Sequence, residues 1–176
     1  DVYNRLLNYT NKVLFFPMDD FITSEVTDIS PEFVIDRLTT LNKLLGSGKY
    51  IVVTNLMGIL RYLPNTKLYK NKIIDINKDM DIDWDDFINK LFDLGYEKKP
   101  VVSRTGEMAI RGYVIDIFPI EFDNPIRIEF WGDTIDSIKY FDLDDQISNT
   151  SVDSVKIYPY TEFLIDGKIE DNIIRK

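Results

Sequence analysis

Between Met108 and Tyr158, apolar and polar residues alternate in four segments, and this period of two constrains the fold more than any other feature of the chain. The segments MAIRGYVIDIF, IRIEFW, TIDSIKYF and VDSVKIY predict four strands of an antiparallel meander. Links such as DNP and GD are short and rich in turn-forming residues. Asp83 is placed to cap a helix that runs to Leu94 with its apolar residues on one face, so we expect this helix to pack on one side of the sheet.

The N-terminal third of the chain follows a different pattern. VLFF at 13–16 and YIVVT at 50–54 are short apolar runs typical of buried strands in a parallel sheet. Between them, Ser30-Pro31 begins a helical repeat of apolar residues that Gly46 ends. The order strand, helix, strand resembles half of a doubly wound α/β sheet.

These patterns predict two units of the fold class α/β plus α+β, with a boundary near residues 61 to 66. Residues 1–62 are expected to form a partial parallel α/β domain, and residues 63–160 an antiparallel meander sheet with a helix on one face. Residues 161–176 are expected to return into the α/β domain. Because the chain begins at Asp1 and not at methionine, we expect it to be a piece of a longer protein.

Charge and composition argue against several classes of function. The chain has 21 basic and 30 acidic residues, a net charge of −9, and such a surface repels phosphate backbones, so we do not expect a stand-alone nucleic-acid binder. Histidine and cysteine are absent, which removes imidazole bases, thiolate nucleophiles and the usual zinc ligands. No apolar run reaches the roughly 18 to 20 residues of a membrane span, so we expect a cytoplasmic protein without membrane contact.

Two motifs imitate ligand sites but fail on their spacing. LLGSGKY at 44–50 contains a Gly-Lys pair, yet a phosphate-binding loop needs glycine where Lys43 stands and serine or threonine where Tyr50 stands. DINKDMDIDWDD at 75–86 imitates a calcium loop, yet Met80 occupies the position of the required glycine. Paired aspartates are abundant in so acidic a chain, and their presence specifies no acid-base pair. We therefore expect no catalytic residue, no metal and no cofactor.

A row of mixed charge in the predicted sheet is the remaining functional candidate. In IRIEFW, alternation sets Arg127 and Glu129 opposite the isoleucines, and Arg111 can face the same way if its strand pairs across the DNP turn. Arginine beside aromatic residues is typical of the centres of protein interfaces. The alternative is a set of exposed cross-strand ion pairs, worth at most about 1 kcal/mol. Alternation continued through Gly112 places three further residues on the side of Arg111: Tyr113, Ile115 and Ile117.

The same segment resembles a known family. GEMAIRGYVIDIFPIEFDNPIRIEFWGDTIDSIKYFD is similar to the motif shared by the nucleotide-excision-repair protein UvrB and the bacterial transcription-repair coupling factors, in which G-E-F-x-x-R-G-x-x-x-D-I-F-P is followed by P-x-R-I-E-F-F-G-D. Upstream, FFPMDD, DRLTTLNKLL and YIVVTNLMGILRYLP resemble the coupling factors more closely than UvrB.

The resemblance implies a specific role. Residues 1–62 would belong to a degenerate helicase-like α/β domain without a working Walker A motif, and residues 63–160 to a UvrB-like domain that binds UvrA. The chain would be a non-enzymatic fragment of a DNA translocase that recruits UvrA to stalled RNA polymerase. ATP, magnesium, RNA polymerase and DNA would bind to parts of the parent protein outside this chain. The alternatives are a fragment of a UvrB-like excision-repair protein and a helicase-domain fragment that contacts DNA directly.

Carried over by position, the UvrA-binding surface of the family falls on five residues: Arg111, Arg127, Glu129, Phe130 and Lys98. This chain departs from the family at two places. UvrB has a second arginine where Ala109 stands here, and coupling factors often have arginine where Glu97 stands, with two lysines following in this chain. Because lysine lacks the planar fork that pairs with carboxylates, Arg111 is the strongest candidate.

Overall fold

The computed structural model describes residues 1–18 and 30–164, and the chain divides into two compact units, Asp1–Thr66 (unit 1) and Lys67–Lys176 (unit 2). It is a mixed helix and sheet protein with a large antiparallel sheet, as predicted for an α+β fold. Most of the predicted return segment, residues 165–176, lies outside the described residues.

Unit 1 is built around one strand-helix-strand element. Its β1 and β2 strands pair in parallel, from Val13 opposite Ile51 to Phe16 opposite Thr54, as the two apolar runs predicted. The connecting helix begins at Pro31, where the fixed φ and missing N–H of proline suit a first helical turn. The Thr40 hydroxyl donates to the Phe15 carbonyl at 2.6 Å and ties this helix to β1. The bounds are α1 Val2–Leu7, β1 Val13–Phe16, α2 Pro31–Leu44, β2 Ile51–Thr54 and α3 Leu56–Leu60.

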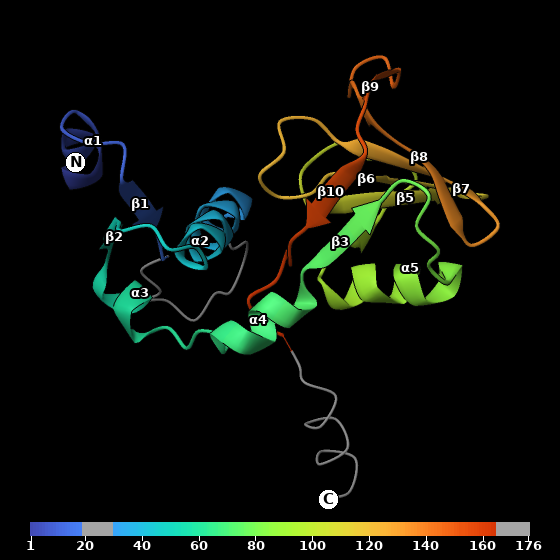
Figure 1. Ribbon diagram of the computed structural model, residues 1–176. Helices are drawn as coiled ribbons and strands as arrows, with labels where there is room; N and C mark the ends of the chain where they lie inside the picture. The colour runs from blue at the N-terminus through green and yellow to red at the C-terminus, as the bar shows by residue number, and fades with distance from the viewer. Residues whose placement is uncertain (19–29, 165–176) are drawn as a thin grey trace, which may run out of the picture. The chain divides into compact units, whose positions relative to one another are not determined.

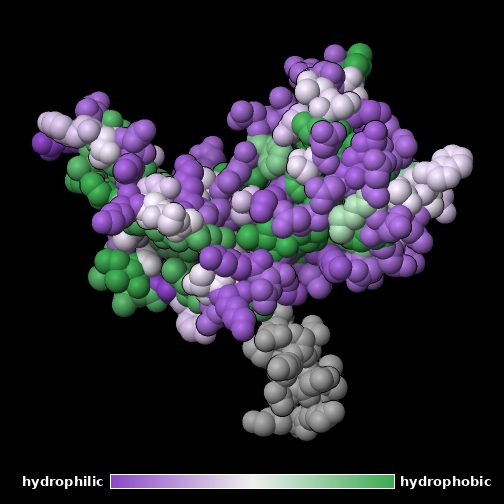
Figure 2. Space-filling view, in the orientation of Figure 1, coloured by the Kyte–Doolittle hydropathy of each residue, from purple (hydrophilic) through white to green (hydrophobic). Residues whose placement is uncertain are grey.

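The strands of unit 1 were predicted to be buried, but several apolar side chains of this unit are exposed. Ile51 and Val52 of β2 are 47% and 39% exposed, because in the described part of the chain β2 has only β1 as a strand neighbour. Figure 2 shows apolar surface over α3, where Leu56 and Ile59 are each 70% exposed.

In the described residues, unit 2 contains a six-stranded sheet, a two-stranded sheet, the short helix α4 and the helix α5 that covers the large sheet. The large sheet has the order β4-β5-β6-β7-β8-β9, in which β5 to β9 form an antiparallel meander and β4 joins β5 in parallel. The bounds are α4 Thr66–Lys72, β3 Ile74–Asn77, α5 Trp84–Asp93, β4 Glu97–Lys98, β5 Glu107–Arg111, β6 Val114–Ile117, β7 Ile126–Trp131, β8 Thr134–Phe141, β9 Ser148–Ser151 and β10 Ser154–Ile157.

The α5 helix forms where predicted and closes one face of the large sheet (Figure 1). The Asp83 carboxylate accepts from the Asp86 backbone N–H at 2.8 Å and so caps the helix, and Gly95, with φ of 89°, follows its C-terminus. Phe87 and Leu91 are fully buried against the sheet. On the large sheet, the residues of this core with no exposed surface are Met108, Ile115, Ile117, Ile126, Ile128 and Ile135.

The segment MAIRGYVIDIF was predicted as one strand, and this is wrong. It forms two strands, β5 and β6, that pair antiparallel with Arg111 opposite Val114. Gly112, with φ of 59°, opens a two-residue hairpin loop, a backbone conformation that glycine adopts at little cost. Because the chain reverses here, alternation cannot be counted through the loop. Ile115 and Ile117 therefore lie in the core and do not share the face of Arg111.

The segment VDSVKIY was predicted as the last strand of the meander, which is also wrong. Its strand β10 pairs antiparallel with β3 in a separate two-stranded sheet, and its Val155 and Ile157 complete the core beside Ile76. The edge of the meander is instead β9, whose sequence SNTS carries no apolar alternation and so gave no strand signal.

Candidate protein-binding face

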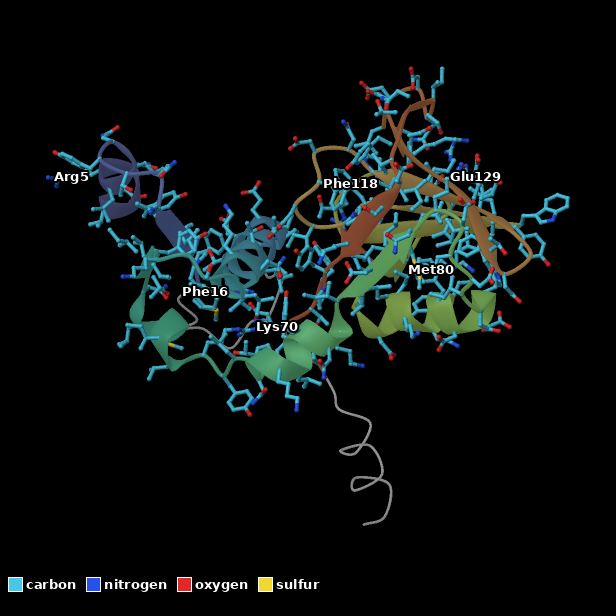
Figure 3. All side chains as sticks on the ribbon, in the orientation of Figure 1. Arg5, Phe16, Lys70, Met80, Phe118 and Glu129 are labelled. Carbon is cyan, nitrogen blue, oxygen red and sulfur yellow. The ribbon has the colours of Figure 1, made fainter. Side chains whose placement is uncertain are left out.

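The side of the large sheet away from α5 carries a row of charged side chains from four successive strands. Figure 3 labels Glu129 on this side. The pairing of β5 to β8 aligns Ala109 with Asp116, Asp116 with Arg127 and Arg127 with Lys139, so these positions share one face. We call the following five residues the charged face: Arg111, Asp116, Arg127, Glu129 and Lys139. They comprise three cations and two carboxylates, a local excess of one positive charge in a chain of net charge −9.

A buried carboxylate is at the centre of this face. Asp116 of β6 has a side chain only 1% exposed, and it accepts hydrogen bonds from the guanidinium groups of both Arg111 and Arg127. A buried, unpaired carboxylate is costly, and two positive charges in contact with it offset that cost. Sequence reasoning missed this residue, although a lone carboxylate in the apolar run VIDIF was a signal.

Arg127 lies below the surface and its donors are almost all engaged. Its Nε and Nη2 donate to the two Asp116 oxygens at 2.7 and 3.0 Å, and its Nη1 donates to the Gln146 carbonyl at 3.3 Å. The guanidinium carbon also lies 4.8 Å from the centroid of the Phe141 ring, within range of a cation–π contact. The hydrogen bonds to Asp116 raise the pKa of Arg127 above its ordinary value, so this side chain stays charged in spite of its burial.

Arg111 differs from Arg127 in exposure. Its side chain is 48% exposed, against 17% for Arg127, and within the described residues its one hydrogen-bonded partner is Asp116. An arginine carries five N–H donors, so most of the donors of Arg111 are available to a partner. The predicted arrangement of this guanidinium, in the open beside Arg127, is the one that the structure has.

Glu129 is held within the same face. Its carboxylate accepts from Lys139 Nζ at 2.6 Å and from the Ser137 hydroxyl at 2.5 Å, and its side chain is 34% exposed. The hydrogen bonds from Lys139 and Ser137 lower the pKa of Glu129, so it is ionised at neutral pH. Glu129 therefore adds a fixed negative charge next to Arg127.

Two predicted contact residues are not part of this face: for Phe130 the prediction of a surface contact is corrected, and for Lys98 partner contact stays a prediction. Phe130 is only 7% exposed, because alternation along β7 turns its ring into the core, where it packs against Trp84 with ring centroids 4.9 Å apart. Lys98 is exposed at the sheet edge, but its register position opposite Met108 belongs to the side that α5 covers.

Trp131, next to Phe130, is the exposed aromatic residue of β7. It is 85% exposed at the end of β7, two positions beyond Glu129 and on the same side of the strand by alternation. A tryptophan this exposed is uncommon in a folded domain and favours an interaction surface. The sequence signal was present in IRIEFW, in which Trp131 alternates with the isoleucines.

Other kinds of site have little support in the described residues. Among residues 1–18 and 30–164, no group of three acidic, histidine or cysteine side chains could hold a metal ion. No helix in that part of the chain is long and apolar enough to span a bilayer. A hollow of about 530 Å³ lies between α4, β3 and α5, on the other side of unit 2, and its charged lining residues include two ion pairs, Lys90 with Asp86 and Lys72 with Asp93.

Comparison with known protein families identifies the family to which the sheets of unit 2 belong. The UvrB interaction domain family matches residues 74–163, which cover the whole of both sheets of unit 2. The chain therefore belongs to the UvrB interaction domain family.

The individual relatives extend this similarity into unit 1. The chain is 38% identical over 153 residues to the transcription-repair-coupling factor of Bacillus subtilis, and 35% identical over 159 residues to that of Staphylococcus haemolyticus. These matches cover 87% and 90% of this chain but only 13% and 14% of the relatives. The chain thus spans about one seventh of the length of the coupling factors that it matches.

Proposed function

We propose that this chain is the part of a transcription-repair coupling factor that docks onto UvrA, and that the charged face together with Trp131 is the docking surface. The observation that carries the proposal is the half-exposed guanidinium of Arg111, next to the buried Asp116 and on the same side of the sheet as an exposed tryptophan. Arginine and tryptophan are the residue types most often found at the energetic centres of protein interfaces. The family to which the chain belongs supports UvrA as the partner.

Folding stability by itself does not explain the position of Arg111. Arg127 already pairs with both oxygens of the buried Asp116, and the pair that half-exposed Arg111 makes with it contributes about 1 kcal/mol or less to folding. The Trp131 side chain is 85% exposed, so its apolar surface contributes little hydrophobic free energy to folding. A partner that covers both residues gives each of them a role.

The test is a calorimetric titration of the full chain with purified UvrA. We expect the wild-type chain to bind and Arg111→Glu to weaken binding by about 2 kcal/mol or more, which is about thirtyfold. The matched control is Arg5→Glu, the same charge reversal at an exposed arginine of α1 in unit 1, which should bind as the wild type does. Unchanged affinity of Arg111→Glu would remove Arg111 from the docking surface.

The names of the relatives support a proposal for the role of the whole protein. We infer that the parent protein acts in the cytoplasm and recruits UvrA to stalled RNA polymerase. Contacts with RNA polymerase and DNA, and the binding of ATP and magnesium, are assigned to parts outside this chain. The parallel pair of β1 and β2 joined through α2 supports the proposal that unit 1 is part of a helicase-like α/β domain. Measuring ATP turnover by the isolated chain tests the assignment of ATP binding to other parts of the protein, and we expect no turnover.

A further inference from the structure

The two arginines of the charged face have different surroundings, although both contact the same carboxylate. Arg127 uses four of its five N–H donors on Asp116, the Gln146 carbonyl and Ser148, the last at 3.5 Å, and its side chain is 17% exposed. It has little left to offer a partner. Arg111 reaches Asp116 through one nitrogen and is 48% exposed.

We propose that Asp116 is a positioning residue for partner binding: it fixes one nitrogen of Arg111 so that the remaining donors of that guanidinium face solvent in one orientation. Arg127 neutralises Asp116 within the sheet, where most of its own N–H donors are already engaged. This inference rests on the proposed function, and it deepens it by naming how the contact residue is oriented and which chemical group it meets.

The energetic reason for such a device is the flexibility of arginine. A free arginine side chain loses up to about 2 kcal/mol of rotamer entropy when it is fixed. An arginine side chain that is already held in the free protein loses no further rotamer entropy when the partner binds. Part of the entropic cost of ordering it then falls on folding and not on binding. Asp116 can hold Arg111 because its own position is fixed: β6 lies between β5 and β7, and the carboxylate is 1% exposed.

The group that meets Arg111 is a carboxylate of the partner. A guanidinium is donor-only and planar, and two of its N–H groups match the two oxygens of a carboxylate. The anchoring by Asp116 leaves such a pair of donors on Arg111 open to solvent. A lysine at this position would keep the charge but could not present this pair.

The decisive variant is Asp116→Asn in the full chain, titrated with UvrA. The amide keeps the volume of the side chain, but it has no negative charge and has an NH₂ donor in place of one acceptor oxygen. It therefore cannot accept all three hydrogen bonds that the two guanidinium groups donate to Asp116. We expect affinity to fall about tenfold, which corresponds to about 1.4 kcal/mol. The matched control is Asp93→Asn, which removes the same charge at an exposed end of α5 and should leave affinity unchanged.

A double-mutant cycle separates positioning from general damage. In an Arg111→Ala background, Asp116→Asn should change affinity less than about twofold, because the residue through which it acts is gone. Arg111→Lys should bind about as weakly as Arg111→Ala. An equal loss from Asp116→Asn in both backgrounds, or no loss in either, would overturn the inference.

A measurement without partner or variant keeps the inference testable if Asp116→Asn does not fold. In ¹⁵N NMR spectra of the free wild-type chain at low temperature, hindered rotation of the Arg111 guanidinium should give separate Nη resonances. Averaged resonances would show that Asp116 does not hold Arg111 and would overturn the inference. If UvrA fails to bind the wild-type chain, the proposed function is wrong, and the Nη resonances still decide whether Arg111 is held.

Discussion

Replacing Arg127 and replacing Arg111 should have opposite consequences for folding and for binding. Arg127→Ala removes the cation that lies against both oxygens of the buried Asp116, at 2.7 and 3.0 Å. Arg111→Ala removes the half-exposed cation and leaves Arg127 in place. We expect the first variant to lose stability and the second to lose partner affinity.

The magnitude follows from the burial of the carboxylate. Removing one partner of a buried ion pair costs about 3 to 5 kcal/mol, because the remaining charge is left without compensation. Here Arg111 and incoming water compensate in part, since the Arg127 side chain is 17% exposed, so we take the lower end, about 3 kcal/mol. Arg111→Ala should cost about 1 kcal/mol or less, because a half-exposed pair is screened by solvent.

Urea unfolding followed by tryptophan fluorescence measures this difference in one unit of the chain. Both tryptophans of the sequence, Trp84 and Trp131, lie in unit 2, so the signal reports the unfolding of that unit alone. Trp84 packs against Phe130 in the core, so unfolding should shift its emission. With an m-value of about 1.5 to 2 kcal/mol/M, the midpoint for Arg127→Ala should fall by about 1.5 to 2 M.

The outcome that refutes this reasoning is equal stability of the two variants. Equal midpoints would mean that water or another side chain solvates Asp116 as well as Arg127 does, and the distinction between an anchoring and a contacting arginine would be lost. A large loss of stability in Arg111→Ala alone would reverse the roles assigned to the two residues.

Two further predictions concern the loop that leads into β5. Glu107 is buried and accepts from Ser103 and Arg104; burial acts to raise its pKa, but these hydrogen bonds prevail and lower it from 4.5. Its contribution to stability is therefore complete above about pH 4.5 and is lost as pH falls through the folded-state pKa; Glu107→Gln should cost about 2 kcal/mol at pH 7 and clearly less at pH 3, and a constant difference in urea midpoint between the two pH values would contradict this. Gly106→Ala should destabilise at least twice as much as Gly112→Ala, which should cost about 1 kcal/mol: both have positive φ, but only at Gly106 would a Cβ meet a ring, that of Tyr160 at 2.1 Å. Thermal unfolding checks the order, and equal losses would mean that the tyrosine moves aside freely.

The elements with strong local signals were predictable from the sequence. Pro31 and Asp83 mark where two helices begin, and alternation gave the strands β7 and β8 within one residue. Among the elements that were missed, two have weak local signals: β4 has two residues, and β9 is entirely polar. Each is held by backbone pairing with a neighbouring strand, β4 with β5 and β9 with β8, and backbone pairing leaves no apolar pattern in the sequence.

The candidate face could be predicted in part, and the omission of Asp116 from it has one cause. Arg111, Arg127 and Glu129 share the face on which the sequence placed them. Asp116 was missed because alternation was counted through Gly112, where the chain turns back, so β6 was assigned the wrong face. A two-residue hairpin loop resets which residues share a face with the preceding strand.

Phe130 and Trp131 show why a contact residue assigned from a family motif should be checked against the geometry of its strand. The two aromatic residues are adjacent, so they point to opposite sides of β7. A surface that uses Arg127 and Glu129 must then take its aromatic residue from an odd-numbered position of this strand, which excludes Phe130 and leaves Trp131. The exposures of 7% and 85% agree with this parity. Along any strand with one buried face, the parity of a single reliable contact residue thus fixes which neighbours can join it in an interface.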